Sequence, residues 1–116
     1  MTILVSGVID LDPAKRDEAL VSARPYVEGA LTQQGCLAYA WTADLTIPGR
    51  VLVFEEWESE AHLAAHLAGP QYRRMLGHLQ AYGITTAVTR PLEGTIREPG
   101  EEPAGRPRAE CCSGRP

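Results

Sequence analysis

The stretch of sequence that decides the fold reads FEEWESEAHLAAHLAGPQY and covers residues 54–72. It starts inside residues 51–57, an apolar run with β-branched and aromatic side chains, which is typical of a strand. Ser59 follows this run and is suited to cap a helix over residues 60–68, because its hydroxyl accepts a hydrogen bond from a free backbone amide. The stretch therefore predicts a strand that leads directly into a helix.

A second helical segment is expected beyond this helix. Gly69 breaks the first helix, and Pro70 is suited to open the next one, since proline is tolerated at the first helical position. Apolar residues then recur at the i, i+3, i+4 and i+7 spacing of a buried helix face. These residues are Tyr72, Met75, Leu76 and Leu79. A last strand is predicted over residues 84–89, ended by Pro91.

The N-terminal part of the chain predicts another strand and helix. Residues 3–9 are apolar and rich in β-branched side chains, which favours a strand. Asp12 is suited to cap a following helix with Pro13 at its first position. Pro25 lies inside the helical pattern and should kink it, because proline lacks a backbone donor and crowds the preceding turn. Gly35 is expected to end this helix.

A β-hairpin is predicted between the two helical regions. Residues 37–42 alternate as a strand, and one of its faces is expected to carry Leu37, Tyr39 and Trp41. A turn over residues 46–49 joins this strand to residues 51–57, which favours antiparallel pairing. The resulting order is β-α-β-β-α-β. It predicts an α+β, ferredoxin-like fold with an antiparallel four-stranded sheet and helices on one face.

The length and net charge of the chain limit the number of domains and the classes of partner that are expected. The 116 residues suffice for one domain, expected over residues 1–96. Residues 97–116 contain no Leu, Ile, Val or aromatic residue and many Pro and Gly, so a disordered tail is expected there. A net charge of −4 argues against a nucleic-acid partner. No apolar run approaches the roughly 20 residues that cross a bilayer, so no membrane partner is expected.

Cysteine usage favours a reducing compartment. The chain has three cysteines, Cys36, Cys111 and Cys112, and an odd count with an adjacent pair is not a disulfide framework. Residues 1–10 lack the basic start and the cleavage site of a secretory signal. A cytoplasmic location is therefore expected.

Two histidines on the central helix are candidate functional residues. His62 and His66 are four residues apart, a spacing that can hold a metal with Glu58 one turn earlier. Two histidines without a second ligand cluster seldom make a site, so a metal is not favoured. Leu63 and Leu67 are expected to mark the buried face, which places His66 at the edge of the core. There it can exchange a proton near neutral pH, although spacing alone favours a histidine hydrogen-bonded to backbone.

Aromatic and acidic residues offer further candidates. Tyr72 lies in the helical stripe, and its hydroxyl needs a partner if buried. The strand aromatics are Tyr39, Trp41 and Trp57. Sheet packing, a dimer interface and a pocket for a flat ligand explain them equally well. Glu55 and Glu56 alternate along their strand, so one of them must face inward or reach a rim; a general-base role stays open.

Residues 53–67, with residues 70–72 after them, resemble the antibiotic biosynthesis monooxygenase (ABM) family. The recurring pattern of this family is a strand that ends in Glu-x-Trp, a helix with a histidine near its end, and an aromatic residue a few positions later. Residues 35–39, Gly-Cys-Leu-Ala-Tyr, resemble the family's second strand. The resemblance covers roughly residues 2–94.

The resemblance implies a dimeric α+β barrel, in which two sheets pack face to face and each subunit has a pocket between sheet and helices. The family includes cofactor-independent monooxygenases of quinols and aromatic polyketides, haem-degrading enzymes and an isomerase of a signal molecule. The haem-degrading members carry a first-strand asparagine and a haem-ligating histidine. The nearest positions here are Ser6 or Gly7 and Leu76, and leucine cannot ligate iron, so haem degradation is not favoured.

The leading hypothesis is a homodimeric monooxygenase, without cofactor, that acts with molecular oxygen on an electron-rich aromatic small molecule. His66 would be the catalytic residue and would take or stabilise the phenolic proton. The substrate-binding residues would be Tyr72, Trp57, Tyr39 and His62. The alternatives are a non-catalytic barrel that binds a small molecule, and an isomerase that moves protons through the same histidine and consumes no oxygen.

Overall fold

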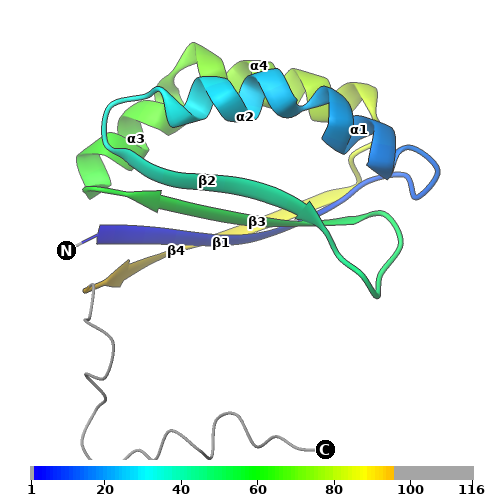
Figure 1. The fold of residues 1–116 in the computed structure, drawn as a ribbon, viewed down its shortest axis with the longest axis horizontal. Helices are drawn as coiled ribbons and strands as arrows, with labels where there is room; N and C mark the ends of the chain where they lie inside the picture. Colours follow the sequence, from blue (N-terminus) through cyan, green and yellow to red (C-terminus); the bar gives the residue numbers. More distant parts are fainter. Residues whose placement is uncertain (1, 96–116) are drawn as a thin grey trace, which may run out of the picture.

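Four strands form one antiparallel sheet in a computed structural model of the protein, which describes residues 2–95 (Figure 1). The strands are β1 (Thr2–Asp10), β2 (Cys36–Ala43), β3 (Arg50–Trp57) and β4 (Thr86–Gly94). Their order across the sheet is β2-β3-β1-β4, and every neighbouring pair is antiparallel. The ferredoxin-like α+β fold predicted from the element order is confirmed. The tail expected over residues 97–116, with Cys111 and Cys112, lies outside the described residues.

The helices of the described chain cover one face of the sheet and leave the other face open (Figure 1). They are α1 (Arg16–Ser22), α2 (Arg24–Leu31), α3 (Glu60–Ala68) and α4 (Pro70–Ala81). Alternate residues of the strands point at this helical layer and form the core with it. The buried apolar residues of the strands are Ile3, Val5, Ile9, Tyr39, Val51, Val53 and Trp57. Within residues 2–95, no helix has the length and apolar character that a membrane crossing requires.

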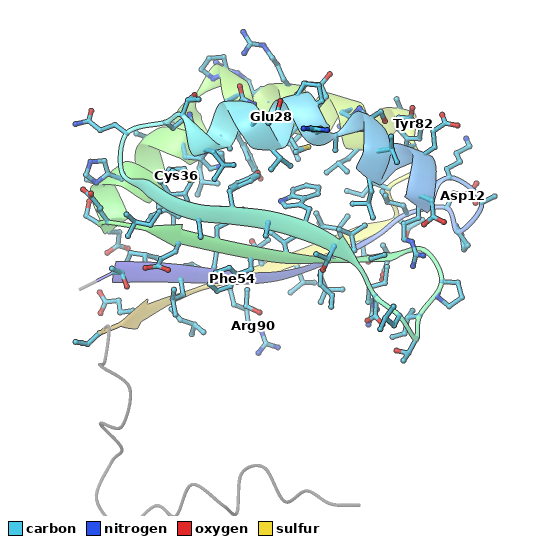
Figure 2. All side chains as sticks on the ribbon, viewed as in Figure 1. Asp12, Glu28, Cys36, Phe54, Tyr82 and Arg90 are labelled. Atoms are coloured by element: carbon cyan, nitrogen blue, oxygen red, sulfur yellow. The ribbon has the colours of Figure 1, made fainter. Side chains whose placement is uncertain are left out.

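The open face of the sheet carries apolar side chains as well. Phe54 and Arg90 lie on it, both opposite Ser6 of β1, and Figure 2 shows them on the side away from the helices. Large apolar residues exposed on β3 and β4 are Leu52, Phe54, Val88 and Leu92. Both faces of the sheet therefore carry large apolar side chains.

The first helical region departs from its prediction. Asp12 accepts a hydrogen bond from the amide of Ala14 at 2.9 Å and so stabilises a turn, while α1 begins only at Arg16. Pro25 was expected to kink one helix, but the helix is interrupted at Ala23, and proline lies in the first turn of α2, where no backbone donor is needed. Gly35 does not end a helix. It lies in the turn into β2 with a φ of 81°, which glycine adopts without strain.

Two strand predictions were also wrong in detail. A β-bulge between Cys36 and Ala38 changes the phase of β2, so Leu37 is exposed while Tyr39 and Trp41 keep the helical side. Strand β4 starts at Thr86 and continues through Pro91 to Gly94. Proline is tolerated there because β4 is an edge strand, where an unpaired position needs no backbone donor.

The stretch over residues 54–72 folds as predicted. The Ser59 hydroxyl accepts a hydrogen bond from the amide of His62 at 3.2 Å and caps α3, which runs from Glu60 to Ala68. Gly69 has an extended backbone, and Pro70 opens α4. This corner joins α3 to α4 within the helical layer that covers the sheet (Figure 1).

Candidate functional site

A cluster of aromatic rings surrounds His66 at the centre of the helix–sheet interface. Its imidazole lies 4.6 Å from the Trp57 ring and 5.6 Å from each of the Tyr39 and Tyr72 rings, measured between centroids. These side chains come from α3, β3, β2 and α4. His66 therefore lies beside three of the four other site residues predicted from the sequence.

The burial of His66 differs from its prediction. His66 is only 2% exposed, whereas Leu67, which was expected to be buried, is 47% exposed. Leu63 and His66, one helical turn apart, form the side of α3 that faces the sheet. Leu67 lies next to the end of this helix and toward the rim. His66 is thus a core residue and not an edge residue.

The hydrogen bonding of His66 fixes its tautomer. Its Nδ1 lies 2.5 Å from Oε1 of Gln33, and an amide oxygen only accepts, so Nδ1 carries the proton. Its Nε2 is buried and has no hydrogen-bond partner among residues 2–95. Burial lowers the pKa of His66, which keeps the imidazole neutral near neutral pH. Nε2 therefore presents a lone pair inside the core, as a general base requires.

Glu55 is the second buried polar side chain of the site. It is 7% exposed, and its Oε1 accepts a hydrogen bond from the indole N–H of Trp57 at 3.0 Å. Its neighbours across the sheet are Val5 on β1 and Tyr39 on β2. Burial raises the pKa of Glu55 and, with the nearby Glu55 carboxyl as a smaller cause, that of the Tyr39 phenol as well.

Two small cavities lie between α3, α4 and the sheet. One has a volume of about 60 Å³ and opens toward the rim, with walls of Val5, Leu63, Leu67 and Pro91. The other, of about 50 Å³, lies deeper and is lined by aromatic and aliphatic residues, among them Tyr39, Trp41 and Leu79. Three residues line both cavities: Glu55, Tyr72 and Thr89. Tyr72 thus stands at the boundary of two mainly apolar spaces.

A separate groove lies on the other side of His66. Its volume is about 230 Å³, and its lining includes His62, His66, Trp57 and Gln33. His62 does not join the ring cluster: its Nδ1 lies 2.7 Å from the Ser59 hydroxyl, and its ring covers Gly35. The predicted substrate-binding residues are therefore divided between the groove and the cavities. Among residues 2–95, no group of three histidine, cysteine or acidic side chains is arranged to hold a metal ion.

The sequence left Glu55 undecided beside Glu56 and gave no indication of Gln33. Alternation along β3 places Glu55 on the same face as Val53 and Trp57, and this signal allows Glu55 to be singled out over Glu56. Gln33 gave no comparable signal, because it follows the end of α2 and meets His66 only through the tertiary fold, 33 residues away in sequence.

Comparison with known proteins identifies the family. A family model described as antibiotic biosynthesis monooxygenase matches residues 2–77, about two-thirds of the chain. The chain belongs to the antibiotic biosynthesis monooxygenase family. An uncharacterized protein of Synechocystis sp. is 28% identical over 74 residues, which are 64% of this chain and 50% of that protein. The chain thus spans half the length of the curated relative that it matches.

Solved structures of other proteins share the fold. A crystal structure described as antibiotic biosynthesis monooxygenase superposes with a TM-score of 0.71 at 24% identity, over 81% of this chain and 99% of its own. A protein of unknown function from Bacteroides thetaiotaomicron, described as a possible oxidoreductase, gives 0.71 at 20% identity, covering 80% and 97%. A protein from Mycobacterium tuberculosis gives 0.71 at 15% identity, covering 84% and 98%. At these identities the likeness shows the ABM fold.

Proposed function

We propose that this ABM-family protein is a cytoplasmic, homodimeric monooxygenase that oxidises an electron-rich phenolic or quinol-type molecule with molecular oxygen and without a cofactor. The observation that carries the proposal is the neutral, buried His66, whose Nε2 lone pair has no partner among the described residues. Such a group accepts a proton from a substrate hydroxyl that is brought against it.

The chemistry divides between protein and substrate. His66 Nε2 takes the phenolic proton, and the phenolate then passes an electron to oxygen. The two resulting radicals combine into a hydroperoxide on a ring carbon. Loss of the proton on that carbon and cleavage of the O–O bond then leave a carbonyl on the ring and release the second oxygen atom as water, so the substrate supplies all the electrons. The protein supplies orientation, exclusion of water and control of the proton. Tyr39, Trp57 and Tyr72 would hold the aromatic ring beside the imidazole.

Substrate entry requires Tyr72 to move. Each cavity is smaller than the about 150 Å³ that a benzene-sized ligand occupies. Tyr72 lines both cavities and its ring lies against His66, so a shift of this side chain would join the two spaces and uncover the imidazole. His62 lines the groove together with Trp57 and His66, so it would contact only a ligand that extends past Trp57 into this groove.

The open face of the sheet would form the homodimer. It carries Leu52, Phe54, Val88 and Leu92, each between 41% and 57% exposed. A contiguous exposed apolar surface of this kind marks an interaction site in soluble proteins. A second copy would cover it by packing sheet against sheet.

Oxygen uptake with a panel of hydroquinones and anthrone-type phenols tests this function. His66→Ala should lower turnover by about a hundred- to ten-thousand-fold, the usual contribution of a positioned base. His78→Gln is the matched control, because His78 bonds to the carbonyl of Ala19 on α1 and packs between Tyr26 and Tyr82, apart from the rings around His66. Unchanged turnover in His66→Ala would rule out the base role of this residue.

One observation favours a second function, a non-catalytic binding protein. Nε2 of His66 is closed off from solvent by the surrounding rings, as in a histidine that only supports packing. The same cavities would then sequester an apolar aromatic molecule. A ligand that binds tightly without any oxygen uptake would support this reading over the monooxygenase.

A further inference from the structure

Glu55 is the one carboxyl group among the described residues that line the two cavities, and the chemistry above does not use it. It occupies a position of β3 that packs like its apolar neighbours Val53 and Trp57. An apolar side chain at this position would avoid the cost of burying a carboxyl group. A carboxyl group in the wall of a mainly apolar cavity therefore calls for a function.

The hydrogen bonds of Glu55 leave one oxygen free for a ligand. Its Oε1 accepts from Trp57 Nε1, and this is the single hydrogen bond of the carboxyl group within residues 2–95. The ion pairs of this part of the chain join Arg16 to Asp17, Arg24 to Glu28 and Arg50 to Asp10, and none includes Glu55. Its Oε2 is thus the carboxyl oxygen that remains available to a ligand in the cavity.

The surroundings of Glu55 favour its neutral form. Burial raises its pKa, and the titratable groups around it are the phenols of Tyr39 and Tyr72 and the thiol of Cys36. His66, in contact with the same Trp57 ring, is held neutral because burial lowers its pKa. Among residues 2–95, no cation offsets a negative charge on this carboxyl group. Since Oε1 already accepts a hydrogen bond, the proton of the neutral carboxylic acid resides on Oε2.

We propose that Glu55 is a ligand-binding residue that donates a hydrogen bond from Oε2 to an acceptor oxygen, such as a carbonyl, of the molecule held in the cavities. The inference rests on the proposed function for the place of the ligand, and it adds a requirement to the substrate class. The substrate is a phenol that also carries a carbonyl oxygen. His66 accepts a proton from the hydroxyl, and Glu55 donates a hydrogen bond to the carbonyl.

Two probes of equal size test this requirement. Para-hydroxyacetophenone and para-isopropylphenol have the same number of non-hydrogen atoms and differ in a carbonyl oxygen replaced by a methyl group. Their dissociation constants are measured by calorimetry on the full chain under nitrogen at neutral pH. The ketone should bind about twofold to tenfold more tightly than the alkylphenol, the worth of one neutral hydrogen bond.

Two variants separate hydrogen bonding from packing. Glu55→Gln should keep the preference for the ketone, because its amide oxygen still accepts from Trp57 and its N–H donates. Glu55→Leu should lose it. Equal affinity of the two probes, no binding of either, or a preference that survives Glu55→Leu would overturn the proposal.

An infrared measurement checks the protonation of Glu55 without any ligand. At neutral pH the wild-type chain should show the carbonyl band of a protonated carboxylic acid, above the amide band, and both variants should lack it. Absence of the band in the wild type would overturn the proposal.

The outcomes for the two proposals can be told apart. A ketone preference without oxygen uptake would support the binding role of Glu55 and refute the monooxygenase. Turnover that depends on His66, without a ketone preference, would support the monooxygenase and refute the role of Glu55.

Discussion

The two faces of the sheet are built from the same strands, and each carries an exception to the usual placement of side chains. On β3 the face under the helices holds Glu55, 7% exposed, beside the fully buried Trp57. On the opposite face of the same strand, Leu52 and Phe54 are 41% and 46% exposed. Buried polar groups and exposed large apolar groups are the informative exceptions in a folded protein, and each face shows one of them. The proposed binding chemistry lies on the covered face and the proposed assembly on the open face.

The largest expected effect is on the covered face. Trp57→Ala should lower the free energy of unfolding by about 3–5 kcal/mol, because it opens a cavity and removes the hydrogen bond to buried Glu55. Urea denaturation measures the change. Phe54→Ala, on the same strand and the other face, is the matched variant, and at concentrations low enough to favour monomers it should cost much less. Similar losses in both variants would mean that the two faces do not differ in packing.

The second effect concerns the open face. Phe54→Lys should shift the protein from dimer to monomer in sedimentation velocity, because it places a charge in the centre of the proposed sheet-to-sheet contact. Val21→Lys serves as control, since Val21 is 79% exposed on α1, on the helical side of the molecule. A wild-type chain that sediments as a monomer at micromolar concentration, or a dimer unchanged by Phe54→Lys, would contradict the assignment of this face.

Local signals predicted the elements but only part of the site. Capping by Ser59 and the Gly69–Pro70 break fixed the bounds of α3, because these effects act within a few residues. Alternation likewise placed Trp57 correctly. The sequence pattern also defined the lengths and order of the segments that carry His66, Tyr39 and Tyr72. The fold brings these segments together, and their rings therefore lie beside one another.

The errors arose where tertiary structure overrides a local pattern. The bulge at Cys36 changed the face of Leu37, and the edge position of β4 allowed Pro91 to remain in a strand. The rotation of α3 about its axis is set by packing on the sheet, and periodicity alone therefore gave the wrong burial for His66 and Leu67. The bond from His66 to Gln33 joins residues with no sequence relation, so it became visible only in the fold.

The smallest effect is a difference in pH dependence between the two faces. On the covered face, burial raises the pKa of Glu55, so the folded state keeps its proton where the unfolded state has lost it. The contribution of Glu55 to stability is present below the unfolded value and declines as pH rises through the raised value. His66, whose pKa is lowered by burial, acts in the opposite direction, so wild type must be compared with Glu55→Gln at each pH. The difference between the two should grow with rising pH.

Asp10 on the open face should show the opposite sign. Its carboxylate accepts hydrogen bonds from Arg50 at 2.8 and 3.1 Å and from Thr86 at 3.0 Å, and the bond from Arg50 is the main cause that lowers its pKa below 3.8. The folded state then releases its proton more readily than the unfolded state, so the stabilisation is present above 3.8 and is lost as pH falls through the lowered value. Asp10→Asn should therefore be less stable than wild type at neutral pH and approach it in acid, whereas Glu55→Gln should match wild type in acid and become the more stable of the two as pH rises. Urea unfolding across the pH range measures the difference in stability between each variant and wild type. If the two differences had the same sign at neutral pH, the electrostatic contrast between the faces would be refuted. Because the Asp10 pair is solvent-accessible, added salt should reduce its effect while leaving that of the buried Glu55 nearly unchanged.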